Sequence, residues 1–279
     1  MASHYSIDPA LPVLLRPDGS VQVGWHPRRA VRVRPPCGVS APGFAALLRS
    51  LHCRTPVATW QRRAQAAGVA DPAELDALVT ALVEADVVIA HRRPRTRRSA
   101  AIRIHGRGPL SDLVAAGLQC SGARIRRSDH GTATITADGT DLVVLSDLLV
   151  VEPRVIRQLH AAAIPHLAVR IRDRTGLVGP MVIPGVTSCL SCADLHRADR
   201  DEAWPALAAQ LRDTVATADR ATVLGTAALA LHQIDRVIRA IGGGSAVPRP
   251  QTLDTTLEFD VATGAVLTRT WRRHPECGC

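Results

Sequence analysis

Lysine is absent from this sequence, in which all 34 lysine-plus-arginine positions are arginine. A lysine that stabilises the charge on a transferring phosphoryl group is therefore excluded. Aromatic residues make up only 3% of the chain, so it has little material for stacking on nucleic-acid bases. The net charge of +9 suggests a nucleic-acid partner, but an arginine-for-lysine bias with abundant alanine, valine and proline is typical of GC-rich coding. We expect no nucleic-acid partner.

Long apolar runs are also missing. The chain has no stretch of about 18 consecutive apolar residues, and its first residues lack the pattern of a secretory signal. The seven cysteines, an odd number, fit a reducing compartment. We therefore expect a soluble, cytoplasmic protein without a membrane partner. Its 279 residues, 46% of them hydrophobic, suffice for one large or two ordinary domains.

Basic residues concentrate in the polar run Arg92-Arg-Pro-Arg-Thr-Arg-Arg98, which separates two regions of apolar periodicity. Proline and unbroken positive charge favour a solvated linker over residues 92–100. A phosphate-binding patch is the alternative interpretation of this run. The linker would separate an N-terminal domain, residues 1–91, from a C-terminal domain, residues 101–279.

Four cysteines form two close pairs that are far apart in the chain: Cys189-Leu-Ser-Cys192 and Cys277-Gly-Cys279. Soft thiolates suit Zn²⁺, and four of them complete its tetrahedron without an open position. The spacing predicts a structural zinc site that ties the C-terminus back onto the middle of the domain. A redox C-x-x-C or a disulfide is the alternative. The other three cysteines lie in segments that favour burial: Cys37, Cys53 and Cys120.

Residues 1–91 predict a small α+β domain of winged-helix type. Strands are expected at 12–16, 20–25 and 30–34, and a short return strand at 87–90. Helices are expected at 42–51, at 55–67 with Thr55 as N-cap, and from Asp71, which is followed by Pro72 and Glu74. The third helix carries acids and no arginine, which disfavours DNA readout.

The same module can capture an extended peptide as an added strand. The candidate contacts are the strand Ala30-Val31-Arg32-Val33-Arg34 and, on the third helix, Leu75 and Leu78. A Val33→Pro change is expected to abolish capture by removing an edge N–H. The alternative is an ordinary edge strand that Arg32 and Arg34 keep soluble.

Residues 101–279 alternate strands and helices, which predicts a mainly parallel sheet covered on both faces. The strand from Ile102 runs into Gly106-Arg-Gly108, and a later strand ends near Asp129. This outline is typical of a nucleotide-binding βαβ unit, but Pro109 and Ser111 stand where further glycines are expected. Asp147 ends another buried strand, Asp141–Asp147.

The last part of the chain predicts three more features. Residues 194–205 are dense in charge, and His196, Asp194 and Asp199 form either an acid/base cluster or, as we prefer, a salt-bridged helix start. A long apolar-periodic helix is expected over 217–241, packing on a sheet face or on a second copy of the chain. A hairpin over 255–271 then leads to the terminal cysteines.

The order of these parts resembles the E1-like (ThiF/MoeB-type) fold with a winged-helix-like module in front. The residues that carry the resemblance are the G-x-G at Gly106, the Asp-Leu-Val-Val strand, Gly176-Leu-Val-Gly-Pro-Met-Val-Ile-Pro-Gly185 and the cysteine pairs. The whole chain is similar to the E1-like partner proteins of azole-forming (TOMM) cyclodehydratase systems. The resemblance implies a leader-peptide recognition element and a dimeric scaffold that presents the precursor to a separate cyclodehydratase.

Departures from that family bear on catalysis. Asp129 and Asp141 are close in sequence, so the segment that carries the family's arginine and lysine is essentially missing, and no cysteine lies between Cys192 and Cys277 for a thioester. We therefore interpret Gly106, Gly108, Asp129 and Asp147 as a vestigial nucleotide site without catalytic residues and expect ATP binding to be weak or absent. The hypothesis is a non-catalytic, zinc-stapled scaffold. The alternative is an ATP-dependent adenylyltransferase acting on a peptide or protein C-terminus.

Overall fold

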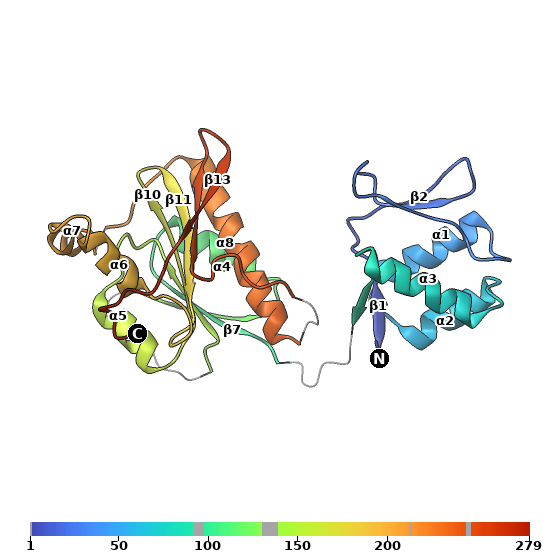
Figure 1. Cartoon of the computed structure of the whole chain (residues 1–279), viewed down its shortest axis with the longest axis horizontal. Helices are drawn as coiled ribbons and strands as arrows, with labels where there is room; N and C mark the ends of the chain where they lie inside the picture. Colours follow the sequence, from blue (N-terminus) through green and yellow to red (C-terminus); the bar gives the residue numbers. More distant parts are fainter. Residues whose placement is uncertain (1, 92–97, 130–138, 213, 244–246) are drawn as a thin grey trace. The chain divides into compact units, whose positions relative to one another are not determined.

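The computed structural model describes residues 2–91, 98–129, 139–212, 214–243 and 247–279. The chain divides into two compact units, Met1–Arg95 and Thr96–Cys279 (Figure 1). Most of the expected basic linker, residues 92–97, lies outside the described residues. No helix in the described part of the chain is both long enough and apolar enough to cross a membrane.

The first unit contains two small antiparallel sheets. The expected strands form one of them, in the order β2 (Val13–Leu15), β3 (Val21–Val23), β4 (Val31–Val33). The other has the order β5 (Thr55–Pro56), β1 (His4–Ser6), β6 (Ile89–His91). The return strand therefore pairs with β1, which the sequence did not predict because its three residues carry no alternating apolar pattern.

The helices of this unit are α1 (Ala41–Arg49), the 3₁₀ turn η1 (Ser50–His52), α2 (Val57–Ala66) and α3 (Pro72–Glu84). Asp71 caps α3 as expected, since its carboxylate accepts the N–H of Ala73 at 2.8 Å. Thr55 is not an N-cap, which corrects the expectation. It lies in β5, and its hydroxyl donates to the carbonyls of Ser50 at 3.0 Å and Cys53 at 2.9 Å.

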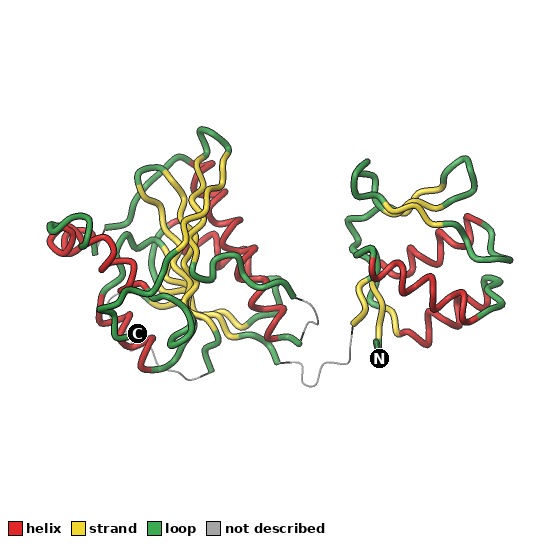
Figure 2. Tube along the Cα trace, viewed as in Figure 1, coloured by secondary structure: helices red, strands yellow, loops and turns green. Residues whose placement is uncertain are grey.

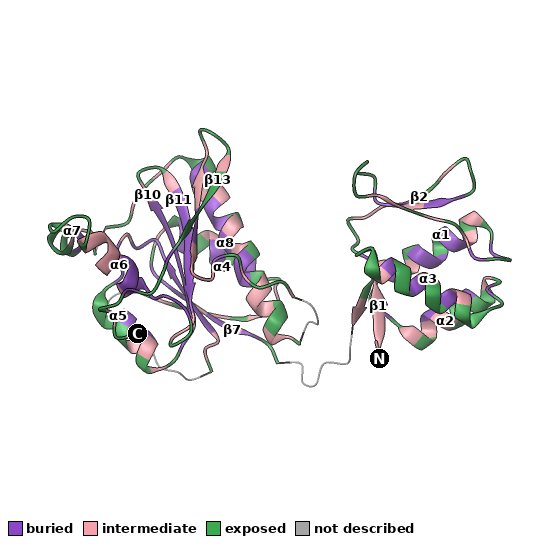
Figure 3. Cartoon of the chain, in the orientation of Figure 1, coloured by how far each residue is buried: buried purple, intermediate pink, exposed green. Residues whose placement is uncertain are grey.

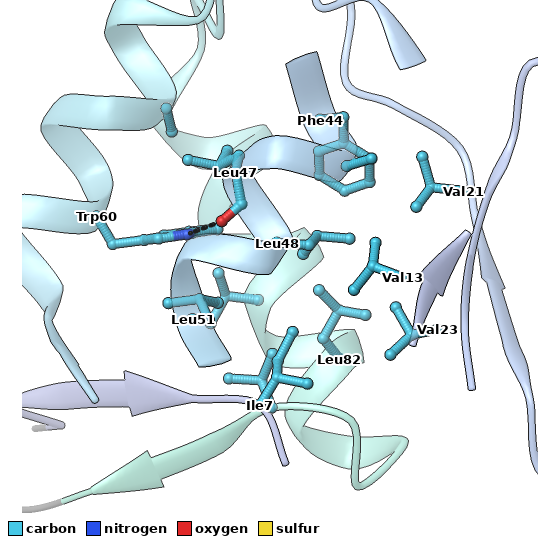
Figure 4. Packing of buried hydrophobic residues seen from close by; sticks show 14 of the residues in the cluster. Ile7, Val13, Val21, Val23, Phe44, Leu47, Leu48, Leu51, Trp60 and Leu82 are labelled. Atoms are coloured by element: carbon cyan, nitrogen blue, oxygen red, sulfur yellow. Dashed lines mark hydrogen bonds between the residues drawn. The ribbon is translucent and has the colours of Figure 1, made fainter. Parts of the chain in front are cut away.

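The core of this unit lies between the helices and the sheet of β2, β3 and β4 (Figure 4). Phe44 and Leu48 of α1 and Trp60 of α2 are completely buried. The indole N–H of Trp60 donates to the carbonyl oxygen of Leu47 at 3.2 Å, so this buried donor is satisfied. Val21 and Val23 contribute the inward-facing positions of β3.

The second unit is built on a seven-stranded sheet of order β13-β12-β11-β10-β9-β7-β8 (Figure 2). Its strands are β7 (Ala101–His105), β8 (Arg124–Ser128), β9 (Leu142–Ser146), β10 (His166–Arg172), β11 (Thr175–Val182), β12 (Thr255–Asp260) and β13 (Ala265–Thr270). The contacts β8-β7, β7-β9 and β9-β10 are parallel, whereas β11, β12 and β13 continue antiparallel. The sheet is therefore mixed, and the expected hairpin at 255–271 extends it.

The change of direction occurs at Asp173 and Arg174, which join β10 to β11. Both have positive φ, +49° and +67°, as a two-residue type I′ hairpin turn requires. Such a turn returns the chain antiparallel, whereas a parallel neighbour needs a long crossover. An Asp-Arg pair is a weak signal for this turn, so the sequence did not predict β11.

Helices cover both faces of the sheet, whose central strands are buried (Figure 3). The alternation of side chains along β9 shows which helices lie on each face. Leu142 and Val144 pack on the side of α4 (Pro109–Leu118) and α8 (Arg220–Ile241). Val143 and Leu145 pack on the opposite side with α5 (Pro153–Ala161) and α6 (Leu190–Ala198). The short helix α7 (Trp204–Leu211) follows α6. The long helix α8 thus buries an apolar face on the sheet, which leaves no need for a second copy to cover that face.

Helix α8 approaches β11 closely at Gly176. A Cβ atom on Gly176 would lie 1.8 Å from the hydroxyl oxygen of Thr226, which is fully buried in α8. The absence of a side chain at this strand position allows the helix and the sheet to pack at this distance.

A Gly176→Ala substitution is expected to destabilise the protein by about 1–3 kcal/mol, because the added methyl group forces the helix or Thr226 to move. Urea unfolding measures the change. The double variant Gly176→Ala/Thr226→Ala should recover part of the loss by removing the clashing hydroxyl. Equal unfolding midpoints for wild type and Gly176→Ala would contradict the close packing.

Candidate functional site

The four paired cysteines come together at the start of α6. The sulfur of Cys189 lies 3.7 Å from that of Cys192 and 3.5 Å from that of Cys277, and the sulfurs of Cys192 and Cys279 are 3.4 Å apart. All four sulfurs lie within 4.8 Å of one another. These separations are far longer than the roughly 2.05 Å of a disulfide bond.

The arrangement fits a tetrahedral metal such as zinc. Four sulfurs at about 2.3 Å from a zinc ion lie about 3.8 Å apart, close to the separations above. Cys189 is also the N-cap of α6, where its sulfur accepts the N–H of Cys192 at 3.4 Å. A redox dithiol would also favour a cysteine at the start of a helix. A redox pair needs only two sulfurs, however, and the sulfurs of Cys277 and Cys279 complete a set of four that favours a metal site.

The thiols differ in their readiness to ionise. Burial raises the pKa of Cys189 above its ordinary value, and burial likewise raises the pKa of Cys279 to about 11. Burial also opposes ionisation at Cys192, but hydrogen bonds from the backbone and the other thiols outweigh it and lower the pKa of Cys192 to about 7. A thiolate is therefore most accessible at Cys192, inside the first turn of the helix.

The C-terminal segment is held by other contacts besides the cysteines. The ring of His274 is buried, and its Nε2 lies 3.0 Å from Asp199, while its Nδ1 accepts the N–H of Glu276 at 3.2 Å. His196 also lies in this group, 3.9 Å from Asp199. Asp194 does not join it, because it pairs with Arg197 at 2.7 Å. Asp194 thus forms a salt bridge within its helix, as we preferred for this segment. His196 and Asp199 instead contact the C-terminal segment, at Arg272 and His274.

The glycines of the expected nucleotide loop make close contacts with β9 instead. A Cβ atom on Gly106, whose φ is +141°, would lie 2.0 Å from the carbonyl oxygen of Ser146. A Cβ atom on Gly108 would lie 2.6 Å from the carboxylate carbon of Asp147. Both positions require glycine because the end of β9 occupies the space beside them.

The carboxylate of Asp147 occupies the N-terminus of α4. It is 3% exposed and accepts the backbone N–H groups of Leu110 at 3.0 Å and Ser111 at 2.9 Å, and the hydroxyl of Ser111 at 2.5 Å. Free N–H groups at a helix N-terminus are where a nucleotide phosphate binds in this type of fold. Here an internal carboxylate satisfies them.

Asp129 lies apart from this network. It is exposed and follows β8, which is parallel to β7, so it lies at the same edge of the sheet as Gly106. Residues 130–138, which follow it, lie outside the described residues. The structure thus places Gly106 against Ser146 and Gly108 against Asp147, and leaves Asp129 just after the neighbouring strand β8.

In the first unit, the hydrogen bonding of β3 determines which backbone groups of β4 face outward. Arg16 donates its N–H to Ser20 at 3.0 Å, and Gly24 donates to Pro12 at 2.8 Å. Gln22 lies midway between these contacts, and hydrogen-bonding pairs alternate along an antiparallel ladder. The backbone groups of Gln22 therefore face β2, and those of its two neighbours face β4.

Val33 pairs with Val21, and Val31 pairs with Val23, so both residues use their backbone groups inside the sheet. The N–H and carbonyl of Arg32 point away from β3, where no further strand pairs among the described residues. Proline at Val33 would break the sheet rather than block its edge, which corrects the expectation from sequence. Arg32 is the position that offers a free donor.

The side chains around β4 divide between core and surface. Arg32 and Arg34 are exposed, Ala30, Val31 and Val33 are half-buried, and Leu78 of α3 is half-buried against the same core. Leu75 is only 2% exposed and belongs to that core, so its side chain is not available to a ligand. Of the two leucines expected to contact a peptide, only Leu78 thus retains exposed surface.

The remaining cysteines correct another expectation. Cys37, Cys53 and Cys120 are all exposed, although their apolar neighbourhoods in sequence favoured burial. Each lies in a loop or just beyond a helix end, where local hydrophobicity does not determine burial.

The sequence did not predict two residues of the hydrogen-bond network around Asp147 at the N-terminus of α4. Ser111 and Ser146 join their hydroxyl groups at 2.7 Å, and both are fully buried. The departure from the glycine pattern at Ser111 was visible in the sequence. Only the structure shows that its hydroxyl binds Asp147.

No protein-family model matches the chain, and no curated protein matches it in sequence. Solved structures share its fold. A heterocyclase in complex with substrate and cofactor matches with a TM-score of 0.65 at 14% identity, and the heterocyclase TruD with 0.65 at 17%. MccB from E. coli, crystallised with MccA-N7isoASN, matches with 0.61 at 14% identity.

Coverage differs between these structures. Each match includes 99% of this chain, but only 39% and 42% of the two heterocyclase chains, against 99% of the MccB chain. The chain thus spans about two-fifths of the heterocyclases. At these identities the likeness concerns the fold.

The cysteine cluster predicts a metal content that can be measured. Purified protein should carry one zinc ion per chain by elemental analysis and keep it through dialysis. Cys277→Ser should lose the ion and lower the melting temperature by several degrees, because the terminal segment is released. The matched control is Cys120→Ser, at an exposed cysteine outside the cluster. Equal zinc content in both variants would contradict a four-cysteine site.

Asp147→Ala is expected to destabilise the protein by about 3–5 kcal/mol, because it leaves buried N–H groups of α4 without an acceptor. Asp147→Asn should cost less, since one acceptor oxygen remains. Asp129→Ala, at an exposed position, is the control and should change stability by less than about 0.5 kcal/mol. Denaturant unfolding compares the three, and similar midpoints for Asp147→Ala and Asp129→Ala would argue against the network.

Proposed function

We propose that the protein is a zinc-stabilised, non-catalytic E1-like scaffold. It binds a precursor (leader) peptide and presents it to a separate modifying enzyme such as a cyclodehydratase. The observation that carries the non-catalytic assignment is the carboxylate of Asp147 on the N–H groups of Leu110 and Ser111.

A phosphate group at the N-terminus of α4 would have to displace that carboxylate. Asp147 is part of the same chain and already in place, where its carboxylate accepts both the backbone N–H and the hydroxyl of Ser111. Phosphate would also meet the negative charge of Asp147, with no lysine anywhere in the chain to offset it. These features support a scaffold in which the former nucleotide site serves only to hold the end of β9 against the start of α4.

Peptide capture is assigned to the first unit, which we interpret as a winged-helix-like recognition domain. The outward N–H and carbonyl of Arg32 can pair with an added strand, and main-chain hydrogen bonds would supply affinity. Arg32 and Arg34 favour an acidic peptide, and the half-buried Val31, Val33 and Leu78 favour apolar side chains within it.

The partner enzyme follows from the family resemblance and from the structural likeness to heterocyclases. Following the family resemblance, we assign the chemistry to a separate cyclodehydratase and the peptide to this chain, which matches about two-fifths of each heterocyclase chain. The zinc would fasten the C-terminal segment to α6. A homodimer belongs to the proposal through the family resemblance alone.

An ATP-dependent adenylyltransferase is the second candidate. The observation in its favour is the match with MccB, which covers 99% of both chains in the complex with MccA-N7isoASN. A structure of MccB with ATP also matches, over 99% of this chain and 98% of that one. ATP–pyrophosphate exchange in the presence of candidate peptides separates the two functions. A scaffold shows no exchange above background, whereas peptide-dependent exchange by the wild-type protein would establish the enzyme.

Arg32→Pro is expected to abolish binding of a precursor's leader peptide, because it removes the outward N–H while the ladder between β3 and β4 remains. The matched control is Arg32→Ala, which keeps the N–H and removes only the charge. We expect it to weaken binding by less than about tenfold. The probe is a fluorescein-labelled synthetic leader of a candidate precursor peptide, and the measurement is fluorescence anisotropy.

Two results would contradict peptide capture at β4. One is equal affinity of Arg32→Pro and wild type. The other is equal loss of affinity in both Arg32 variants, which would assign binding to charge and not to strand addition. Circular dichroism of Arg32→Pro is the control that shows whether the unit is folded.

A further inference from the structure

The second unit contains a cavity of about 480 Å³ that the proposed function does not use. It is lined by the loop after β9, the end of β10 and helices α6 and α7. Apolar side chains, among them Leu149, Ile156 and Leu211, form much of its wall. Five arginines and three aspartates also line it. A cavity of this size with apolar walls and a few polar groups is typical of small-molecule sites.

Arg170 is the unusual member of this lining. It is 9% exposed, and among the described residues its guanidinium forms no ion pair within 4.0 Å and no hydrogen bond, although the charge of Asp194 attracts it from farther away. Burial lowers the pKa of Arg170 to about 10, and the nearby positive charge of Arg197 contributes. The side chain is therefore still charged at neutral pH. A buried charge without a partner is costly, so such groups are normally paired.

The other arginines of the cavity already have partners or are exposed. Arg197 pairs with Asp194 at 2.7 Å, and Arg269 and Arg172 lie 2.9 Å and 3.7 Å from Glu258. The fifth arginine of the lining, at position 200, is exposed to solvent. Arg170 is thus the one guanidinium of the cavity that is both buried and unpaired among the described residues.

A second donor in the same lining has no acceptor. The indole nitrogen of Trp204 is buried and has no hydrogen-bond partner. The ring lies against the guanidinium of Arg197, 5.1 Å from ring centroid to Cζ, which fixes its position. A buried donor of this kind is normally satisfied, so Trp204, together with the unpaired charge of Arg170 beside it in the lining, indicates that an acceptor belongs in the cavity. Water could accept the indole N–H but would not neutralise Arg170.

We propose that this cavity binds a small ligand in which a carboxylate is joined to an apolar body. The carboxylate pairs with the guanidinium of Arg170, whose planar fork matches it, and the apolar part lies against Leu149, Ile156 and Leu211. A single negative charge suits the site, because one buried guanidinium lacks a partner and the lining aspartates repel further anionic charge.

The test uses 3-phenylpropionate, its neutral amide 3-phenylpropionamide, and phenyl phosphate as probes of the full chain. Isothermal titration calorimetry should show binding of the acid with one site per chain. The amide should bind at least about tenfold more weakly, because it cannot neutralise Arg170. Phenyl phosphate should bind no better than the acid. This comparison needs no variant and so does not depend on the folding of a mutant.

Arg170→Met supplies an independent readout. It should abolish binding of the acid and raise the melting temperature of the protein without probe, because an apolar side chain replaces an unpaired buried charge. The matched control, Arg154→Met on the exposed face of α5, should change neither. Equal binding of acid and amide, tighter binding of phenyl phosphate, or no saturable binding of the acid at millimolar concentration would each overturn the proposal.

Discussion

The contact between the carboxylate of Asp147 and the N-terminus of α4 determines how the second unit is organised. It joins the end of β9 to the start of the helix that follows β7, and it leaves no room for side chains at Gly106 and Gly108. The N–H groups at which a glycine-rich loop normally binds phosphate are here hydrogen-bonded to a carboxylate of the same chain. The same glycines are required for a different reason, the close approach of two strand ends.

The cysteine cluster, on the opposite face of the sheet from α4, also joins segments that are far apart in sequence. Its sulfurs are close enough for a tetrahedral metal, and the histidine contact to Asp199 holds the same terminal segment without one. Both contacts hold distant parts of the chain together. Four thiolates around a zinc ion leave no open coordination position, and the carboxylate of Asp147 is occupied by hydrogen bonds. The molecule thus shares its fold with heterocyclases and MccB, and these two contacts serve to hold its segments together.

Strong local patterns predicted much of this arrangement. The cysteine spacing, the cap at Asp71 and the buried strand before Asp147 could be interpreted directly, because each depends on a few neighbouring residues. Other features depend on distant partners. The direction of β11 depends on positive φ at Asp173 and Arg174, and the outward N–H of Arg32 depends on how β3 pairs with β2. The unpaired guanidinium of Arg170 has no sequence signal, since its environment is assembled from segments far apart.

Titration of Mg²⁺-ATP into the full chain tests the central claim most directly. If Asp147 occupies the phosphate position, calorimetry should show no saturable heat up to millimolar nucleotide, with the zinc in place throughout. Binding of one nucleotide per chain at micromolar concentration, with its phosphates resolved beside Gly106 in a crystal of the complex, would contradict the account.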